Sequence, residues 1–175
     1  MSDYQPTATV HEDGVTLRSM QIEDGAPVWE LVKDTGVLDL NSAYAYLMMG
    51  AFFPLTSIVA EEEGHLLGFT IAFFEPEKDD TVFLWQIGVS PKAHGKGIGS
   101  RILDELMDRT TKVGAKFLET TVTPSNEASE ALFKSLARRN DTNCDISPFF
   151  RAEHFPKSGE TAHEGERLFR IGPFS

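Results

Sequence analysis

The chain has 175 residues and a formal net charge of −11 at pH 7, with 27 acidic side chains against 16 basic ones. This length suits one domain with a sizeable core. The negative surface repels nucleic-acid phosphates and anionic lipid head groups, which argues against a nucleic-acid or membrane partner. The single cysteine, Cys144, excludes an internal disulfide. No apolar run approaches the ~20 residues that a helix needs to cross a bilayer. Both features favour a location in the reducing cytoplasm.

The start of the chain differs in character from the rest. Residues 1–14 are polar and acidic and lack the basic and apolar regions of a signal peptide, so we expect a flexible leader before a single domain at 15–175. Beyond it, apolar runs predict strands and apolar residues at helical spacing predict helices. The first of these elements are a strand at 15–20, a helix at 23–36, a helix after Asn41 or Ser42, and strands at 55–61, 66–74 and 81–89.

The second half continues with alternating elements. Its patterns predict a helix at 100–112, a strand at 116–122, a helix at 125–138 and a closing strand at 167–171. Residues 75–80 are expected to form a polar loop, and residues 139–166 an irregular segment with embedded aromatics. This mixture of strands and helices indicates an α/β (α+β) fold class.

A glycine-rich segment, HGKGIG at 94–99, stands between a predicted strand and a predicted helix. Glycines let the main chain adopt unusual dihedral angles and approach a ligand closely. A helix N-terminus adds unpaired N–H groups and partial positive charge, so the segment can hold an anion. A turn that only connects strand to helix is the alternative. The spacing matches neither the P-loop pattern GxxxxGK[ST] nor the dinucleotide pattern GxGxxG.

Two motifs carry a resemblance to a known family. The segment from His94 to Gly99 resembles the Q/R-x-x-G-x-G/A acyl-CoA signature of GNAT-type N-acetyltransferases, with His94 in place of Arg or Gln. TPSNEASEALFKSLAR resembles the N-x-x-A-x-x-L-[YF] helix of the same family, beginning at Asn126. The resemblance implies the GNAT fold, which has a central mixed, mostly antiparallel sheet flanked by helices. In this fold the sheet splays between the fourth and fifth predicted strands, at 81–89 and 116–122.

The family resemblance also implies acetyl-CoA as cosubstrate and no metal. The pyrophosphate would lie on the amides of residues 95–100, and the pantetheine along the strand at 85–89. Asn126 would contact the cofactor arm, and a role as helix N-cap is compatible with that. The cofactor-binding residues expected on this basis are Ile87, Val89, His94, Gly95, Lys96, Gly97, Ile98, Gly99, Ser100 and Asn126.

A narrower resemblance covers roughly residues 15–174. It rests on GVLDLNSAYAYL, FLWQIGV, FLETTVTPSN, SPFFRAEHF and RLFRIGPF, which are similar to the L-2,4-diaminobutyrate acetyltransferases of ectoine biosynthesis. This implies direct acetyl transfer from acetyl-CoA to the 4-amino group of L-2,4-diaminobutyrate in a ternary complex, within a homodimer. Acetylation of another small amine, such as a polyamine, lysine or ornithine, is one alternative. A non-catalytic acetyl-CoA-binding module is another.

The chemistry requires acidic groups that bind ammonium and a base that removes a proton from the attacking amine. Asp39 in VLDLNS and Glu153 in RAEHF are favoured for amine recognition, although a turn residue and a solvated loop carboxylate are their alternatives. The base is left open among Glu153, His154 and a water chain. We expect catalytic roles for Glu153, His154 and Asp39, and a substrate pocket lined by Asp39, Asn41, Tyr44, Trp85, Thr121 and Glu153.

Besides His94, the sequence departs from the family pattern at two places. Trp85 and Gln86 occupy the strand on which many relatives place a carboxylate. Phe133 stands where the family has a proton-donating tyrosine. At most one of Tyr44 and Tyr46 is expected to face the pocket, since residues two apart on a helix do not share a face. A strand-borne base and a tyrosine acid are therefore in doubt, and the thioester oxygen would rely on a main-chain amide of residues 87–89.

Overall fold

The computed structural model describes residues 6–156 and 163–174. Its strands are β1 (Thr9–Val10), β2 (Thr16–Ser19), β3 (Ile58–Glu62), β4 (His65–Glu75), β5 (Lys78–Val89), β6 (Phe117–Val122), β7 (Asn143–Phe150) and β8 (Glu166–Gly172). Its helices are α1 (Gly25–Thr35), α2 (Ala43–Phe52), α3 (Ile98–Thr111) and α4 (Glu127–Arg139), with 3-10 turns η1 (Ile22–Asp24), η2 (Pro91–Ala93) and η3 (Ala152–His154).

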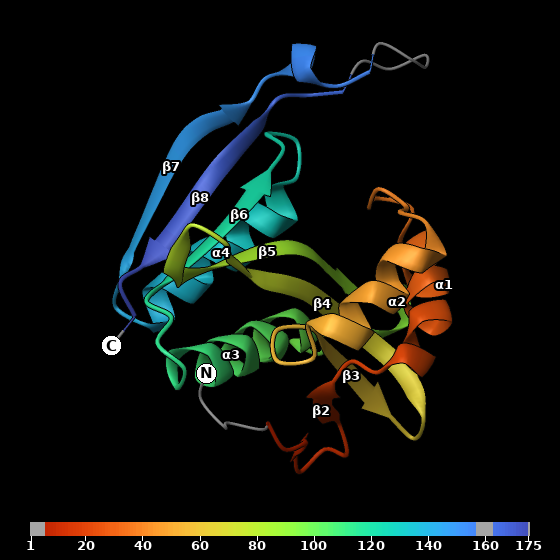
Figure 1. Cartoon of the computed structure of the whole chain (residues 1–175). Helices are drawn as coiled ribbons and strands as arrows, with labels where there is room; N and C mark the ends of the chain where they lie inside the picture. The colour runs from red at the N-terminus through yellow and green to blue at the C-terminus, as the bar shows by residue number, and fades with distance from the viewer. Residues whose placement is uncertain (1–5, 157–162, 175) are drawn as a thin grey trace.

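All of these strands join one sheet, in the order β1-β2-β3-β4-β5-β6-β8-β7. Every neighbouring pair is antiparallel except β5 and β6, which run parallel. Helices α1 and α2 cover one face of the sheet and α3 and α4 cover the other, while the β7–β8 hairpin extends beyond the body of the molecule (Figure 1). The predicted mixed, mostly antiparallel sheet flanked by helices is confirmed.

Strands β5 and β6 pair over only part of their length. Their parallel register runs from Thr81 opposite Phe117 to Leu84 opposite Thr120 and then stops. On its other edge β5 stays paired with β4 as far as Val89, opposite Gly68. Residues 85–89 therefore have a main-chain edge that no described strand covers. The predicted splay between the two strands is confirmed.

Two apolar clusters hold the helices on the sheet. The α3/α4 side buries the apolar side chains of α3, including Ile102 and Leu106, together with Phe133 and Phe169. The α1/α2 side buries Val28, Met49, Phe69 and Ile71 around Tyr46. Apolar burial at roughly 25 cal/mol per Å² is the main stabilising contribution on both faces. Phe133, which replaces the tyrosine of the family pattern, thus belongs to the core.

A β-bulge in β5 changes which way its side chains point. The register passes from Ala72 opposite Leu84 to Ile71 opposite Gln86, so Trp85 is an extra residue on β5. A bulge of this kind puts two successive side chains on one face of a sheet. Trp85 and Gln86 consequently both face the α1/α2 side, where each lines the same cavity.

Two predictions about loops are wrong. Residues 75–80 do not form a long loop, because β4 reaches Glu75 and β5 begins at Lys78, whose ammonium group pairs with the Glu75 carboxylate at 3.1 Å. Residues 139–166 are not irregular throughout, because β7 pairs with β8 along the sheet edge. The expected leader contributes β1, which pairs with β2, and residues 1–5 lie outside the described residues.

The start of α1 is tied to the sheet by charge. The guanidinium of Arg18 on β2 donates to both carboxylate oxygens of Asp24, at 2.7 and 2.8 Å, and also to Glu61 on β3 at 2.7 Å. Burial raises the pKa of the Asp24 carboxyl, but Arg18 and the N–H of Gln21 outweigh it and hold the pKa below its usual value. Asp24 therefore stays ionised and anchors α1, which ends at Gly36 in the left-handed conformation (φ 64°).

We predict that Asp24→Asn lowers the free energy of unfolding at pH 7 by about 2 kcal/mol, since a charge-assisted hydrogen bond to a guanidinium is lost. The pKa of the Asp24 carboxyl is lower in the folded state than its value of about 4 in the unfolded chain. Its contribution to stability is therefore fully present above pH ~4 and is lost as the pH falls through the folded-state pKa. Urea denaturation should show the gap from wild type narrowing between pH 5 and pH 3. Asp34→Asn, at an exposed position of α1, is the control. A difference in unfolding free energy between wild type and Asp24→Asn that does not change with pH would contradict the prediction.

Candidate active site

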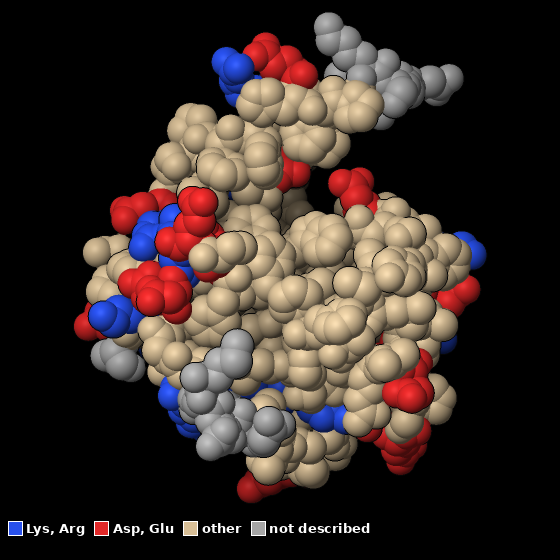
Figure 2. Space-filling view, in the orientation of Figure 1, with Lys and Arg blue, Asp and Glu red and all other residues tan. Residues whose placement is uncertain are grey.

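A cavity of about 700 Å³ opens where β5 and β6 part. Its walls come from the loop between α1 and α2, from β5 and β6, from the start of α4, and from the β7–β8 hairpin. Figure 2 shows the hollow between the hairpin and the body of the molecule. The lining residues are Val37, Leu38, Asp39, Asn41, Phe73, Phe83, Trp85, Gln86, Thr121, Val122, Thr123, Asn126, Phe150, Phe155, His163 and Glu166.

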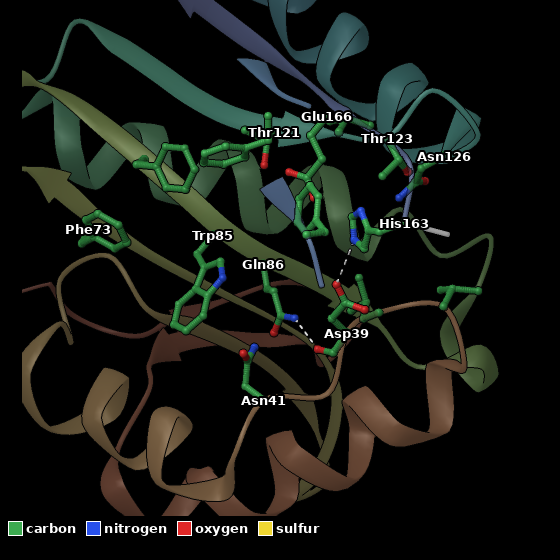
Figure 3. A pocket seen from close by; sticks show the side chains of 16 residues that line it. Asp39, Asn41, Phe73, Trp85, Gln86, Thr121, Thr123, Asn126, His163 and Glu166 are labelled. Atoms are coloured by element: carbon green, nitrogen blue, oxygen red, sulfur yellow. Dashed lines mark hydrogen bonds and ion pairs between the residues drawn. The ribbon is translucent and has the colours of Figure 1, made fainter. Parts of the chain in front are cut away.

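Five residues expected at the site from the sequence line this cavity. Asp39 and Asn41 lie on the α1–α2 loop, Trp85 on the β5 bulge, Thr121 on β6 and Asn126 at the start of α4 (Figure 3). They are widely spaced along the chain and are brought together by the parting of β5 and β6.

Two further acidic or basic groups line the cavity and were not predicted. Glu166, the first residue of β8, lies on the wall opposite Asp39, so carboxylates face the space from two sides (Figure 3). His163 lies between them, with its Nε2 3.8 Å from the Asp39 Oδ2 atom. No local sequence pattern marks either residue, because only the pairing of β7 with β8 places them here. Carboxylates on opposite walls are suited to binding a small cation with more than one ammonium group.

The orientation of His163 is fixed by its own surroundings. Its ring stacks on Phe155, with centroids 3.7 Å apart and an interplanar angle of 14°. Its Nδ1 lies 2.6 Å from the Glu164 carbonyl oxygen. A carbonyl accepts only, so Nδ1 carries the hydrogen and Nε2 is the atom that can take up a proton. That atom faces Asp39 and the cavity.

Aromatic side chains form the third wall. Trp85 lies beside Phe73 and Phe83, whose ring centroids are 5.6 Å apart. The face of an indole ring attracts a nearby cation. This wall can therefore hold the apolar part of a ligand and contribute to the binding of an ammonium group.

Three residues expected at the pocket lie outside it. Tyr44 is 68% exposed on α2, and Tyr46 is instead the buried tyrosine. Glu153 and His154 form part of η3 near the end of the extended hairpin (Figure 1). Glu153 pairs there with Arg151 at 2.7 Å, and its side chain is 63% exposed. The expectation that these side chains share a pocket with Asp39 is corrected: the β7–β8 pairing carries η3 past the cavity into solvent.

The glycine-rich segment has the geometry expected of an anion cradle. Gly95 and Gly97 are left-handed, with φ of 80° and 70°, and no atom lies within 4 Å of a Cβ built on either. Helix α3 begins directly after Gly97 and no side chain caps it. The amides of its first turn, Ile98 to Ser100, therefore remain for a ligand. Lys96 adds positive charge, although its ammonium group also contacts Glu62 at 3.3 Å.

The remaining expected cofactor residues lie around this cradle. His94 is exposed and Ser100 half-buried, while Ile98 and Gly99 are buried against the core. Ile87 and Val89 pack their side chains toward the α3 cluster, which leaves the open main-chain edge of β5 beside them. The N-cap role of Asn126 is confirmed, since its Oδ1 accepts from the Ser129 N–H at 3.1 Å. The open edge of β5 thus runs from the cavity-lining Trp85 and Gln86 toward the segment that carries the cradle.

Within residues 6–156 and 163–174, no group of three or more His, Cys, Asp or Glu side chains could hold a metal ion. Among the helices in these same ranges, none is both long and apolar enough to cross a bilayer.

Residues 27–137 match the model of the Acetyltransferase (GNAT) family. L-2,4-diaminobutyric acid acetyltransferase from Marinococcus halophilus is 48% identical over 93% of this chain and 92% of its own length. The protein of the same name from Nocardia farcinica is 43% identical over 91% of this chain and 80% of its own length.

Solved structures agree with the family match. Diaminobutyrate acetyltransferase EctA from Paenibacillus lautus, in complex with its substrate L-2,4-diaminobutyric acid and coenzyme A, has a TM-score of 0.87 and 42% identity, covering 92% of this chain and 96% of that one. The ribosomal-protein-S18-alanine N-acetyltransferase from Escherichia coli shares the fold, with a TM-score of 0.70 and 20% identity. The chain belongs to the GNAT acetyltransferase family.

We predict that Gly97→Val weakens acetyl-CoA binding by roughly tenfold or more, because a branched residue disfavours a left-handed conformation and would occupy the space above the cradle. Isothermal titration calorimetry measures the affinity directly. Gly114→Val is the matched control, since Gly114 is also left-handed, at φ 107°, with no atom within 4 Å of a Cβ built on it. Equal affinity losses in both variants would mean that the effect is not local to the cradle.

Proposed function

We propose that this member of the GNAT family transfers the acetyl group of acetyl-CoA to the 4-amino group of L-2,4-diaminobutyrate. The product is N4-acetyl-L-2,4-diaminobutyrate, and the reaction is a step of ectoine biosynthesis. The observation that carries this proposal is the cavity, with carboxylates on opposite walls beside the open edge of β5. The chain's similarity over almost its full length to diaminobutyric acid acetyltransferases supports the same substrate.

The charges of diaminobutyrate complement the cavity. At neutral pH the substrate carries two ammonium groups and one carboxylate. Asp39 and Glu166 can each accept from one ammonium group, and the face of Trp85 can attract one of them. The side chains of Asn41 and Thr121 supply uncharged donors for the substrate carboxylate. A volume of about 700 Å³ leaves room for the end of the cofactor beside this small substrate.

Acetyl-CoA can follow the path from the cradle to the cavity. The free amides at the start of α3 would hold the pyrophosphate, and the open edge of β5 at residues 85–89 would pair with the pantetheine. Asn126 lines the cavity and would contact this arm of the cofactor. A main-chain amide of residues 87–89 would then donate to the thioester oxygen as the tetrahedral intermediate forms.

Proton removal is assigned to the groups around Asp39. The attacking ammonium must lose a proton before its nitrogen has a lone pair, and the free Nε2 of His163 faces the cavity where that nitrogen would lie. Glu153 and His154 remain candidates from the sequence, and their exposure at the hairpin end favours His163 over both. Phe133 is buried and cannot donate, so solvent would protonate the departing thiolate.

Transfer would take place directly, in a ternary complex. The thiol of Cys144 lies on β7, packed against the α3/α4 cluster, and is not among the groups that line the cavity. Burial raises the pKa of this thiol, which keeps it protonated and poorly nucleophilic. Both facts support attack by the amine on the thioester without an acyl-cysteine.

We also propose a homodimer in the cytoplasm. Phe149 and Phe150 are exposed on β7, with ring centroids 4.6 Å apart. Exposed aromatic side chains at the end of an edge strand form a surface that a second copy of the chain can cover. Use of acetyl-CoA and a single free cysteine fit a reducing compartment.

We predict that Asp39→Asn and Glu166→Gln each lower kcat/KM for diaminobutyrate by about ten- to a hundredfold, since each loses a charge-assisted contact to ammonium. The affinity for acetyl-CoA should change little. Release of free thiol from acetyl-CoA measures the reaction, with Asp34→Asn as control. Glu153→Gln separates the two site assignments, because it should stay near wild type if the cavity is the active site. Wild-type kinetics in both cavity variants would contradict the assignment.

The same assay distinguishes the other functions. Thiol release with spermidine, lysine or ornithine but not with diaminobutyrate would indicate another small amine as substrate. Binding of coenzyme A without thiol release for any of these amines would indicate a non-catalytic module.

A further inference from the structure

The side chain of Asp39 is not held in place by its own packing. It is 89% exposed, and its only described ion-pair partner is His163 at 3.8 Å. A carboxylate in this situation can point at a substrate only if the main chain that carries it is fixed. A fixed position for Asp39 therefore requires contacts to the main chain of residues 39–41 in the α1–α2 loop.

The amide of Gln86 provides the first contact. Its Nε2 donates to the carbonyl oxygen of Asp39 at 2.7 Å (Figure 3). Gln86 itself is nearly buried, and its own carbonyl accepts from the Thr70 hydroxyl at 3.0 Å. The bulge at Trp85 makes this contact available, because it turns Gln86 to the α1/α2 side. Without the extra residue, Gln86 would point into the α3 cluster.

Tyr46 provides the second contact. Its hydroxyl donates to Gln86 Oε1 at 3.0 Å and accepts from the Asn41 N–H at 3.4 Å. The ring is fully buried and meets Phe69 edge-on, with centroids 6.3 Å apart. Gln86 and Tyr46 thus form one chain of hydrogen bonds that begins at the Asp39 carbonyl and ends at the Asn41 amide.

Two further contacts hold the same stretch. The indole N–H of Trp29 on α1 donates to the Asn41 carbonyl at 3.2 Å. The side chain of Leu38 packs over Gly88 of β5. A Cβ built on Gly88 would lie 3.0 Å from the Leu38 Cδ1 atom. These contacts all reach the main chain of residues 39–41 or the Leu38 side chain, whereas the Asp39 carboxylate has only His163 beside it among the described residues.

We propose that Gln86 and Tyr46 are positioning residues for the amine substrate, which act by fixing the main chain of residues 39–41 so that Asp39 faces the bound amine. The expected effect on kinetics rests on the proposed function, whereas the expected effect on the loop conformation does not depend on it. Neither side chain needs to touch the reacting atoms. Their loss should weaken recognition of the amine and leave the cradle for acetyl-CoA intact, since the hydrogen bonds of Gln86 and Tyr46 reach the α1–α2 loop and β4 rather than residues 94–100.

Tyr46→Phe is the most direct test, because it removes one hydroxyl and keeps the buried ring. In the ligand-free protein, hydrogen exchange at residues 37–42 should accelerate by about five- to tenfold, as expected for one lost hydrogen bond. KM for diaminobutyrate should rise by a similar factor, with KM for acetyl-CoA unchanged. Thr110→Val is the matched control, since it removes a buried hydroxyl that bonds to Leu106 within α3.

A double-mutant cycle separates positioning from a general loss of stability. If Tyr46 acts through Asp39, Tyr46→Phe should have little further effect on KM in an Asp39→Asn background. Gln86→Leu should behave like Tyr46→Phe, and Gln86→Glu should not restore the loop, because a carboxylate cannot donate to the Asp39 carbonyl.

The outcomes are distinct. Unchanged exchange at residues 37–42 in Tyr46→Phe would overturn the proposal, as would an equal rise in KM for both substrates or full additivity with Asp39→Asn. If wild-type protein releases no thiol with diaminobutyrate, the proposed function fails, and the exchange experiment alone then decides whether Tyr46 and Gln86 fix the loop.

Discussion

The structure depends on the place where β5 and β6 stop pairing. Their parallel register ends at Leu84 and Thr120, yet β5 continues to Val89 on the support of β4 alone. Main-chain N–H and C=O groups need partners, and the free edge of β5 is left to pair with an extended ligand. The gap that this creates is also the cavity, so under the proposed function one feature would provide both the binding edge for the cofactor and the space for the acceptor.

The elements around this opening divide the chemistry among them. The glycine-rich segment and the uncapped start of α3 supply amides for a diphosphate. The bulge at Trp85 supplies an aromatic wall and turns Gln86 toward the α1–α2 loop. The β7–β8 hairpin supplies Glu166 and His163 from the far side. An acidic protein of net charge −11 thus has uncapped amides in the segment after β5, and carboxylates that line the cavity from the α1–α2 loop and from the start of β8.

Local signals predicted the parts of the fold that local physics decides. Three features could be predicted from a few neighbouring residues: the glycine-rich segment at 94–99, helix α3 and the N-cap Asn126. The structure has each of them as expected. Asp39, Asn41, Trp85 and Thr121 were placed by resemblance and do line the cavity.

The parts that depend on distant pairing were missed. Strand β7 has no clear alternating pattern, contains Pro148 and lies at the sheet edge, so only its register with β8 makes it a strand. That register carries His163 and Glu166 to the cavity, although neither belongs to a motif. It also carries Glu153 into solvent, although SPFFRAEHF was part of the family resemblance. The bulge at Trp85 likewise exists only in the pairing of β5 with β4.

The position of the acetyl group in the product tests the central claim most directly. If the opening of β5 and β6 aims the thioester at the side-chain amine of a diamine held by Asp39 and Glu166, the reaction of acetyl-CoA with L-2,4-diaminobutyrate must acetylate N4 alone. NMR of the product would then show the amide coupled to the C4 methylene. Acetylation at N2, a mixture of both isomers, or no product at all would contradict the account.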